Sequence, residues 1–206
     1  MDFARPLAVV TPTLEADVLG VLASGTAPLT GREIQRRANA SQEGVRRTLD
    51  RLTRQGTVLR DRAGNAHLYR LNRTHLAAPY IEALANLRLE LLDRLRAAIA
   101  AWEVPPIVAV LFGSAARGEA GTESDLDILV VGPGEPVDSH AEWRAQLDAL
   151  EADAFAWTGN DARVIEYGEG ELVRRRADPF LDTVALEGIP LYGSLEMLRR
   201  TRSRSK

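Results

Sequence analysis

The sequence has no cysteine, a single lysine (Lys206) and only three histidines among its 206 residues. The absence of cysteine excludes a disulfide scaffold, a thiolate zinc site and a cysteine nucleophile, and the histidines show no spacing typical of a metal site. No apolar run reaches the length of about 18 residues that a membrane-spanning helix needs. The N-terminal segment also lacks the pattern of a signal peptide. We therefore expect a cytoplasmic protein with no membrane partner.

The near-neutral net charge of −3 conceals an uneven distribution of charge along the chain. Residues 1–80 hold 12 arginines and 7 acidic residues, a net charge of +5, so the remainder of the chain has a net charge of −8. The length allows one large domain or two small ones, because domains commonly hold about 100 to 150 residues. The charge difference favours two parts with different partners.

The first part of the chain has the pattern of three helices followed by a hairpin. Apolar residues recur at helical spacing over 14–22, 30–38 and 41–56, and Thr30 with Glu33 forms a capping-box sequence. Two short alternating runs around Gly64-Asn65 then predict a β-hairpin over 57–71. This order is that of a winged helix-turn-helix, and residues 1–76 resemble winged-helix regulators of the MarR and ArsR type.

The resemblance implies that residues 1–76 form a DNA-binding domain. Arginines on the third helix suit the major groove, and arginines on the hairpin suit phosphates or the minor groove. Candidate contacts are polar residues of the third helix and the hairpin, namely Ser41, Gln42, Arg46, Arg47, Arg60 and Arg62. The alternative is that these positions are merely solvated surface. Such regulators are usually dimers, so we also expect a homodimer.

Residues 77–104 are predicted to form one long connecting helix, because an amphipathic pattern runs without a breaker from Pro79 to Trp102. This helix offers a plausible dimer face. Beyond it the apolar runs 107–112, 126–131 and 162–167 alternate with helical segments. We therefore predict an α+β protein in which residues 105–193 form a second domain, with a mixed sheet flanked by helices, and residues 194–206 form a basic tail.

The most informative stretch joins a glycine-serine pair to two aspartates. A buried strand runs into Gly113-Ser114, and Asp125 and Asp127 bracket Leu126 where the next strand begins. Residues i and i+2 of a strand face the same way, so both carboxylates project to one side. Paired carboxylates suit magnesium, which prefers oxygen ligands and is usually completed by substrate phosphates. Gly113 lets a phosphate approach the backbone.

This pattern, Gly-Ser, ten residues and Asp-x-Asp, resembles the signature of minimal nucleotidyltransferases of the DNA polymerase beta superfamily. The resemblance implies transfer of a nucleoside monophosphate from an NTP to an acceptor with two magnesium ions held by Asp125 and Asp127. It also implies that Gly113 and Ser114 bind the β and γ phosphates. Two further residues are assigned roles at the nucleotide: Arg117 neutralises phosphate charge or pairs with a nearby glutamate, and Ser124 orients the loop before Asp125.

A third catalytic carboxylate is expected on the strand 162–167. The register of the family places it at Arg163, and the neighbouring acids are Asp161 and Glu166. Because the side-chain period of a strand is two, Asp161 and Arg163 share a face and Glu166 lies on the other. We take Glu166 as the third catalytic residue, and an arginine in the acid's place favours weakened or altered catalysis.

The sequence thus predicts a two-domain protein that binds DNA and transfers nucleotides. The acceptor stays open among RNA, protein and small molecules, because the metal site does not specify the acceptor pocket. One alternative is a transcriptional regulator whose nucleotidyltransferase domain is degenerate and only binds nucleotide or dimerises. Another is a component of a toxin–antitoxin pair.

Overall fold

The computed structural model describes residues 1–134, 141–175 and 178–199. It divides into two compact units. The N-terminal unit comprises Ala4–Arg88 with Asp2, and the C-terminal unit comprises Leu89–Lys206 with Met1 and Phe3. The division after residue 88 falls inside the segment 77–104 that the sequence predicts as a connector.

The N-terminal unit contains the three helices and the hairpin that the sequence pattern predicts. In chain order its elements are η1 (Pro6–Val9), α1 (Leu14–Ala23), β1 (Leu29–Thr30), α2 (Gly31–Arg37), α3 (Gln42–Arg54), β2 (Val58–Ala63), β3 (Ala66–Leu71) and α4 (Ala78–Ala85). The strands form an antiparallel sheet of order β1-β3-β2. The predicted capping box of Thr30 with Glu33 is present, and the Ser41 hydroxyl accepts a hydrogen bond from the Gly44 N–H at the start of α3.

The apolar stripe predicted for the third helix lies in the core of this unit. Val45, Leu49 and Leu52 of α3 are at most 3% exposed. They belong to the same cluster as Val18 of α1 and Ile34 of α2. Burial of one such side chain contributes about 2 kcal/mol relative to exposure, so this stripe fixes which face of α3 points to solvent.

The single helix predicted from Pro79 to Trp102 is interrupted. The structure has α4 (Ala78–Ala85) and α5 (Leu87–Ala100), with Asn86 between them at φ −100° and ψ 12°. Asparagine hydrogen-bonds nearby backbone in non-helical conformations, which lowers its helix propensity, and apolar periodicity does not register this break. The stripe of α5 is buried within its own unit through Leu91, Leu95 and Ile99. This stripe of α5 is therefore used in the core of its own unit, and the expected dimer face stays a prediction.

The C-terminal unit is a mixed four-stranded sheet with helices on both faces. Its further elements are β4 (Val108–Phe112), α6 (Gly113–Arg117), β5 (Leu126–Gly132), α7 (Ala141–Thr158), β6 (Ala162–Gly168), α8 (Glu169–Arg174), α9 (Pro179–Glu187), β7 (Ile189–Tyr192) and α10 (Glu196–Arg199). The strand order is β6-β5-β4-β7. Strand β4 is antiparallel to both β5 and β7, whereas β5 and β6 are parallel. The predicted mixed sheet flanked by helices is confirmed.

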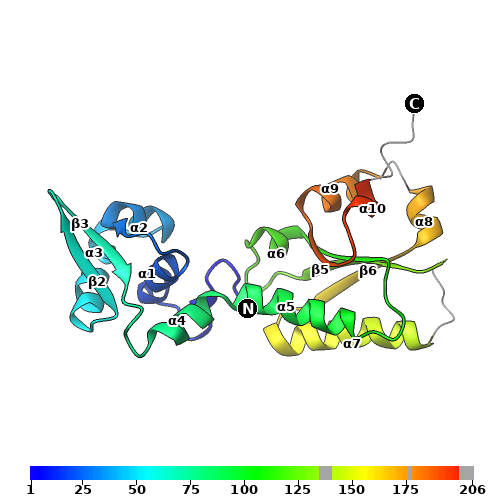
Figure 1. The fold of residues 1–206 in the computed structure, drawn as a ribbon, viewed down its shortest axis with the longest axis horizontal. Coiled ribbons are helices and arrows are strands. Elements are labelled where there is room, and N and C mark those ends of the chain that lie inside the picture. The colour runs from blue at the N-terminus through cyan, green and yellow to red at the C-terminus, as the bar shows by residue number, and fades with distance from the viewer. Residues whose placement is uncertain (135–140, 176–177, 200–206) are drawn as a thin grey trace. The chain divides into compact units, whose positions relative to one another are not determined.

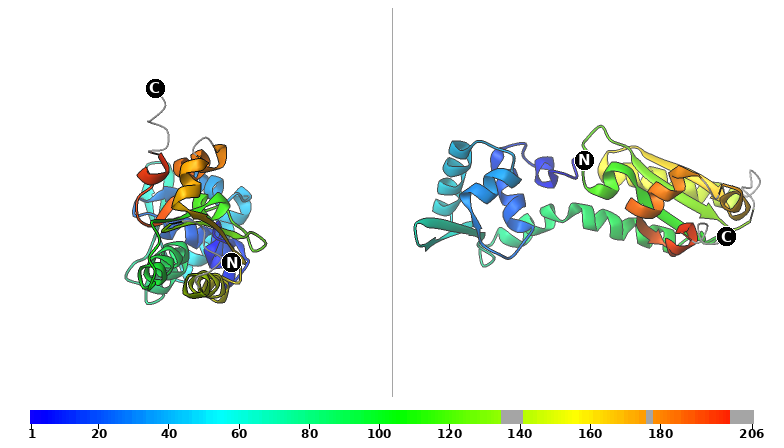
Figure 2. Two further views of the ribbon diagram at one scale, coloured as in Figure 1. Left: turned by 90° about the vertical axis from the view of Figure 1, so that its right-hand side faces the viewer. Right: turned by 90° about the horizontal axis from the view of Figure 1, so that it is seen from above.

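Two apolar layers cover the two faces of this sheet. Helices α5 and α7 lie on one side of it and α8, α9 and α10 on the other (Figure 1). The left panel of Figure 2 looks along α5 and α7 and shows them side by side beneath the sheet. Alternate residues of β5 enter the two layers, with Ile128 in the layer of α5 and α7 and Leu129 in the layer of α8 and α9. None of the described helices combines the length and apolarity needed to cross a bilayer.

One residue from the start of the chain belongs to the core of the C-terminal unit. Phe3 is 5% exposed and packs in the cluster formed by α5, α7 and the sheet. Its backbone N–H donates a hydrogen bond to the carbonyl of Ala120 at 2.8 Å. The chain therefore contributes to this unit, leaves it to form residues 4–88 of the N-terminal unit, and returns to it.

Candidate functional site

The glycine-serine pair and the two aspartates meet at one end of neighbouring strands. Strands β4 and β5 are paired so that Phe112, the last residue of β4, lies opposite Asp127. The chain leaves β4 at Gly113 and turns directly into α6, whereas Asp125 immediately precedes β5. The antiparallel register therefore brings Gly113 beside Asp127, although fourteen residues separate them in sequence.

Gly113 is required by both backbone conformation and space. Its φ of +71° lies in the left-handed region that residues with a Cβ disfavour. A Cβ built at Gly113 would lie 2.7 Å from Oδ2 of Asp127, closer than a carbon–oxygen contact permits. The glycine therefore allows the Asp127 carboxylate to lie directly against the turn that begins α6.

Arg163 completes the group formed by the aspartates. In the parallel register of β5 and β6 it lies opposite Asp127, so the two side chains share a face of the sheet. Its guanidinium donates a hydrogen bond from Nη2 to Oδ2 of Asp125 at 2.6 Å. The Arg163 side chain is 67% exposed and that of Asp125 is 35% exposed. An arginine thus stands where the sequence comparison expected an acid.

The surroundings of Asp127 disfavour its charged form. Burial raises the pKa of Asp127 above its ordinary value; the positive charge of Arg163 opposes this shift, and the negative charge of Asp125 adds to it. Desolvation of the charged form is thus the dominant effect on Asp127. A cation that binds beside Asp127 would compensate for this cost.

The expectation that Glu166 joins the aspartates is wrong in geometry. In the register of β5 and β6, Glu166 lies opposite Val130, which packs in the layer of α5 and α7. Its carboxylate accepts a hydrogen bond from Nε1 of Trp143 at 2.7 Å and lies 3.6 Å from the guanidinium of Arg144. Because Val164 faces the same layer, the strand keeps a regular alternation that directs Glu166 away from Asp127.

Arg117 and Ser114 lie in the short helix α6. The Arg117 guanidinium donates hydrogen bonds to Glu119 at 2.8 Å and to Glu187 at 2.9 Å, so it has the structural pairing that the sequence left open, with an additional partner from the end of α9. Ser114 is half-buried in the first turn of α6, next to Gly113. The structure therefore brings Ser114 close to the aspartates and holds Arg117 in ion pairs.

Sequence reasoning missed Asn160, which orders the loop before Asp125. Asn160 is 1% exposed, and its Nδ2 donates hydrogen bonds to the carbonyls of Gly121 at 3.0 Å and Ser124 at 2.9 Å. The Ser124 hydroxyl accepts a hydrogen bond from the Gly121 N–H at 3.0 Å. The hydroxyl and the carbonyl of Ser124 are thus both hydrogen-bonded within this region. The dipeptide Gly159-Asn160 resembles an ordinary turn and does not indicate this role.

Two carboxylates are the acidic ligands that this site offers a cation. Within the described residues, no group of three or more His, Asp or Glu side chains is placed to hold a metal ion. Asp125 and Asp127 with the open turn at Gly113 nevertheless fit magnesium, which binds through one or two carboxylates and leaves positions for water and phosphate oxygens. The donor set thus suits a metal ion that arrives with a nucleotide.

The N-terminal unit presents a surface rich in arginine on α3 and β2. All six predicted DNA contacts are exposed: Ser41, Gln42, Arg46, Arg47, Arg60 and Arg62. A groove of about 610 Å³ on this surface is lined by Arg46, Arg47, Asp50, Arg51, Thr53, Arg54 and Arg60. The right panel of Figure 2 shows α3 and the hairpin of β2 and β3 from above.

Carboxylates within the same surface pair with its arginines. Glu43 lies 2.8 Å from both Arg46 and Arg47, and these two guanidinium groups lower its pKa to about 2. Asp50 lies 3.4 Å from Arg46 and 3.3 Å from Arg60. The sequence placed the arginines on the exposed face but did not identify these partners.

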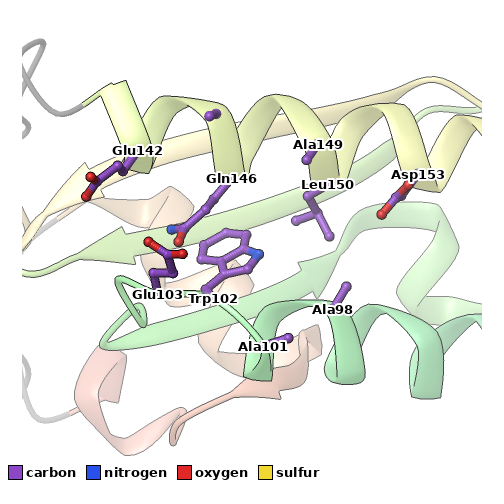
Figure 3. A pocket seen from close by; sticks show the side chains of 10 residues that line it. Ala98, Ala101, Trp102, Glu103, Glu142, Gln146, Ala149, Leu150 and Asp153 are labelled. Carbon is purple, nitrogen blue, oxygen red and sulfur yellow. The ribbon is translucent and has the colours of Figure 1, made fainter.

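A second groove lies in the C-terminal unit, on the face of the sheet opposite Asp127. It holds about 530 Å³ between α5 and α7, and its walls are largely alanine with Trp102 and Leu150. Figure 3 shows the Trp102 indole between the two helices, with Gln146 beside it. The Gln146 amide is occupied, because it exchanges two hydrogen bonds with the backbone of Val104. The groove and Asp127 therefore lie on opposite faces of the sheet.

Comparisons with known proteins find similarity in the part of the chain that holds the aspartate pair. The family model described as the nucleotidyltransferase domain matches residues 92–178. The sequence matches no curated protein.

Three solved structures are similar to part of this chain at low identity. A mutant MntA–HpeT toxin–antitoxin is 16% identical with a TM-score of 0.40, over 54% of this chain and 84% of that chain. A toxin–antitoxin with AMP-PNP is 20% identical with a TM-score of 0.34, over 56% and 78%. Another MntA–HpeT mutant is 20% identical with a TM-score of 0.33, over 56% and 77%. The segment that matches the nucleotidyltransferase domain, residues 92–178, includes Gly113, Asp125, Asp127 and Arg163, so this part of the chain is similar to that family.

Proposed function

We propose that this protein transfers a nucleoside monophosphate from an NTP to an acceptor in a magnesium-dependent reaction. The observation that carries the proposal is the approach of Asp127 to the turn at Gly113, at the end of β4 and β5 and within the matched segment 92–178. The turn offers a backbone without a side chain at Gly113, and the aspartates offer ligands for a cation. Nucleotidyl transfer needs both at one place.

The residues of the site have different roles in this reaction. Gly113 and Ser114 would bind the β and γ phosphates at the start of α6, and Asp125 and Asp127 would hold magnesium, which when bound would supply positive charge to the triphosphate. The oxygen of the acceptor hydroxyl forms a bond to the α phosphorus and its proton passes to water, while the bond to the β-phosphate oxygen breaks and pyrophosphate leaves. Glu166 takes no part, since it lies on the opposite face of the sheet.

The test is transfer of label from NTPs radiolabelled at the α phosphate. The full chain is incubated with each of the four NTPs, with and without magnesium, in separate reactions with RNA, protein and small-molecule acceptors. We expect label to reach one acceptor class only when magnesium is present, and no label with the variant Asp125→Ala/Asp127→Ala. Equal labelling by the wild type and this variant would contradict the proposal.

The pairing of Arg163 with Asp125 favours one alternative, a regulator that binds a nucleotide without transferring it. Calorimetry distinguishes the two. NTP binding that changes DNA affinity in the absence of any transfer supports the regulator. A toxin–antitoxin role stays a prediction from the sequence.

DNA binding is the second proposed activity, supported by the exposed arginines of α3 and β2 in the order helix, helix, helix, hairpin of a winged helix. Arg47 is the most exposed arginine in the ion pairs of α3, at 76%. We expect Arg47→Ala to weaken binding to duplex DNA at each salt concentration and to reduce the slope of log affinity against log salt by about 1. Fluorescence anisotropy with labelled DNA measures both.

Arg94→Ala is the matched control for this experiment. Arg94 lies on α5 of the C-terminal unit and pairs with Glu90 at i,i+4 and 2.8 Å, as Arg47 pairs with Glu43. The two variants therefore remove the same charge and the same kind of pair. If both weaken DNA binding equally, the effect comes from net charge and the surface of α3 is not the DNA contact.

A further inference from the structure

The arginine at the aspartate pair occupies a position that a divalent cation would need. Arg163 lies opposite Asp127 in the sheet, and its Nη2 lies 2.6 Å from Oδ2 of Asp125. This distance is that of a charge-assisted hydrogen bond. One carboxylate oxygen of the two aspartates is thus already hydrogen-bonded to an arginine of the same chain.

The pair is held at the surface and can open. The Arg163 side chain is 67% exposed, so it can turn into solvent without leaving an unfilled space in the core. An exposed ion pair of this kind contributes little to stability. A role in folding therefore does not explain why an arginine lies beside the two acids.

The charge balance of the group depends on Arg163. With Asp125 and Asp127 ionised, the two carboxylates hold a charge of −2, and the guanidinium reduces it to −1. A divalent ion that approaches Asp125 must displace the guanidinium and also meets its repulsion. Even at the dielectric constant of water, one positive charge a few Å from a divalent ion changes its affinity by roughly tenfold.

We propose that Arg163 is a resident cation on Asp125 that competes with the divalent ion and keeps the affinity of the site for that ion low in the absence of nucleotide. The proposal rests on the proposed function, because it takes Asp125 and Asp127 as the metal ligands. The displaced guanidinium remains on the sheet face of Asp127, where it can donate to the phosphate oxygens of an incoming NTP. Arg163 thereby acts as a positioning residue that couples arrival of the nucleotide to metal binding.

The test is a titration of the full chain with Mn²⁺ as the probe, without nucleotide, in which electron paramagnetic resonance measures the free ion. We expect Arg163→Gln to bind Mn²⁺ roughly tenfold more tightly than the wild type, whereas Arg163→Lys, which keeps the charge, stays near the wild type. In the background of Asp125→Asn, Arg163→Gln should give less than half of this gain, because the competing pair is already absent.

The matched control is Arg144→Gln. Arg144 is also exposed, at 61%, and its guanidinium lies 3.6 Å from Glu166 on the opposite face of the same sheet, so the variant removes the same charge away from the aspartates. We expect its Mn²⁺ affinity to match the wild type. Unchanged or weaker binding by Arg163→Gln, an equal gain in both variants, or no binding in any variant overturns the proposal.

Failure of this proposal and failure of the proposed function give different results. The titration requires no turnover, and the radiolabel assay requires no knowledge of the ion's affinity. Tighter Mn²⁺ binding by Arg163→Gln without label transfer by any variant would support the competition and contradict nucleotidyl transfer. Label transfer by the wild type with no change in the Mn²⁺ affinity of Arg163→Gln would support the activity and contradict the role of Arg163.

Discussion

Asp127→Asn is expected to lower the rate of label transfer by about 10³-fold, because the charge stabilisation of a bound metal ion is worth several kcal/mol and each 1.4 kcal/mol is tenfold in rate. Asparagine keeps the shape of the side chain beside Gly113 and removes the negative charge that holds the cation. The loss should appear in the rate at saturating NTP and magnesium, measured with the acceptor class found in the transfer assay.

The same substitution should leave the fold intact. The pKa of Asp127 in the folded protein is raised by burial, so the ionised carboxylate is less favourable in the folded state than in the unfolded state at neutral pH. Neutral asparagine removes this cost, and the midpoint of urea unfolding should be no lower than in the wild type. Loss of activity together with unfolding would therefore contradict the expectation as clearly as retained activity.

Asp153→Asn is the control for charge. Asp153 is exposed on α7 and lines the groove between α5 and α7, on the face of the sheet opposite Asp127. It loses the same charge in the same unit, so its rate of transfer should equal that of the wild type. A similar loss in both variants would show that the net charge of the unit, rather than the ligand at Asp127, controls the rate.

Gly193→Ala is expected to give the largest loss of stability, about 3 kcal/mol or more of the free energy of unfolding. Gly193 follows β7 with a φ of +69°, a conformation that costs a residue with a Cβ about 1–2 kcal/mol. A Cβ would also lie 2.3 Å from the carbonyl oxygen of Ile107, which precedes β4. Overpacking against backbone adds about 1–3 kcal/mol, because the chain of the neighbouring strand must move.

Gly159→Ala separates the two causes. Gly159 has a similar φ of +71°, but a Cβ there meets nothing within 4 Å. Its loss should be limited to the conformational cost of about 1–2 kcal/mol. The three tryptophans, Trp102, Trp143 and Trp157, all lie in the C-terminal unit, so their fluorescence during urea unfolding reports the stability of this unit. Equal losses in the two variants would refute the clash at Gly193.

Local sequence signals predicted most elements of the fold, and the exceptions have specific causes. The capping residues Thr30 and Ser41 and the apolar runs gave the helices and central strands, because these signals act within a few residues. The break at Asn86 and strand β7 were not predicted. Strand β7 has four residues including Pro190, and such a short run becomes a strand only because β4 provides the partner and the edge position tolerates proline.

The candidate site was predictable where its residues are close in sequence. The prediction failed where the register between strands determines which residues meet. Gly113, Asp125 and Asp127 share one motif, and the structure brings Gly113 and Asp127 together. The position of Glu166 depends on the alternation along β6, which directs it to Trp143. The partner Glu187 of Arg117 and the hydrogen bonds of Asn160 join segments 70 and 36–39 residues apart, a separation at which sequence spacing has no influence.

The place of Phe3 makes the N-terminal unit an insertion rather than an extension. Residues 4–88 form a long loop out of one fold, closed at its base by the hydrogen bond from Phe3 to Ala120 and by the packing of the Phe3 ring. Folding of the C-terminal unit must therefore pay the entropy of closing this loop, a cost that grows only slowly with loop length. During synthesis Phe3 leaves the ribosome before Ala120, so it finds its place only after Ala120 has been made.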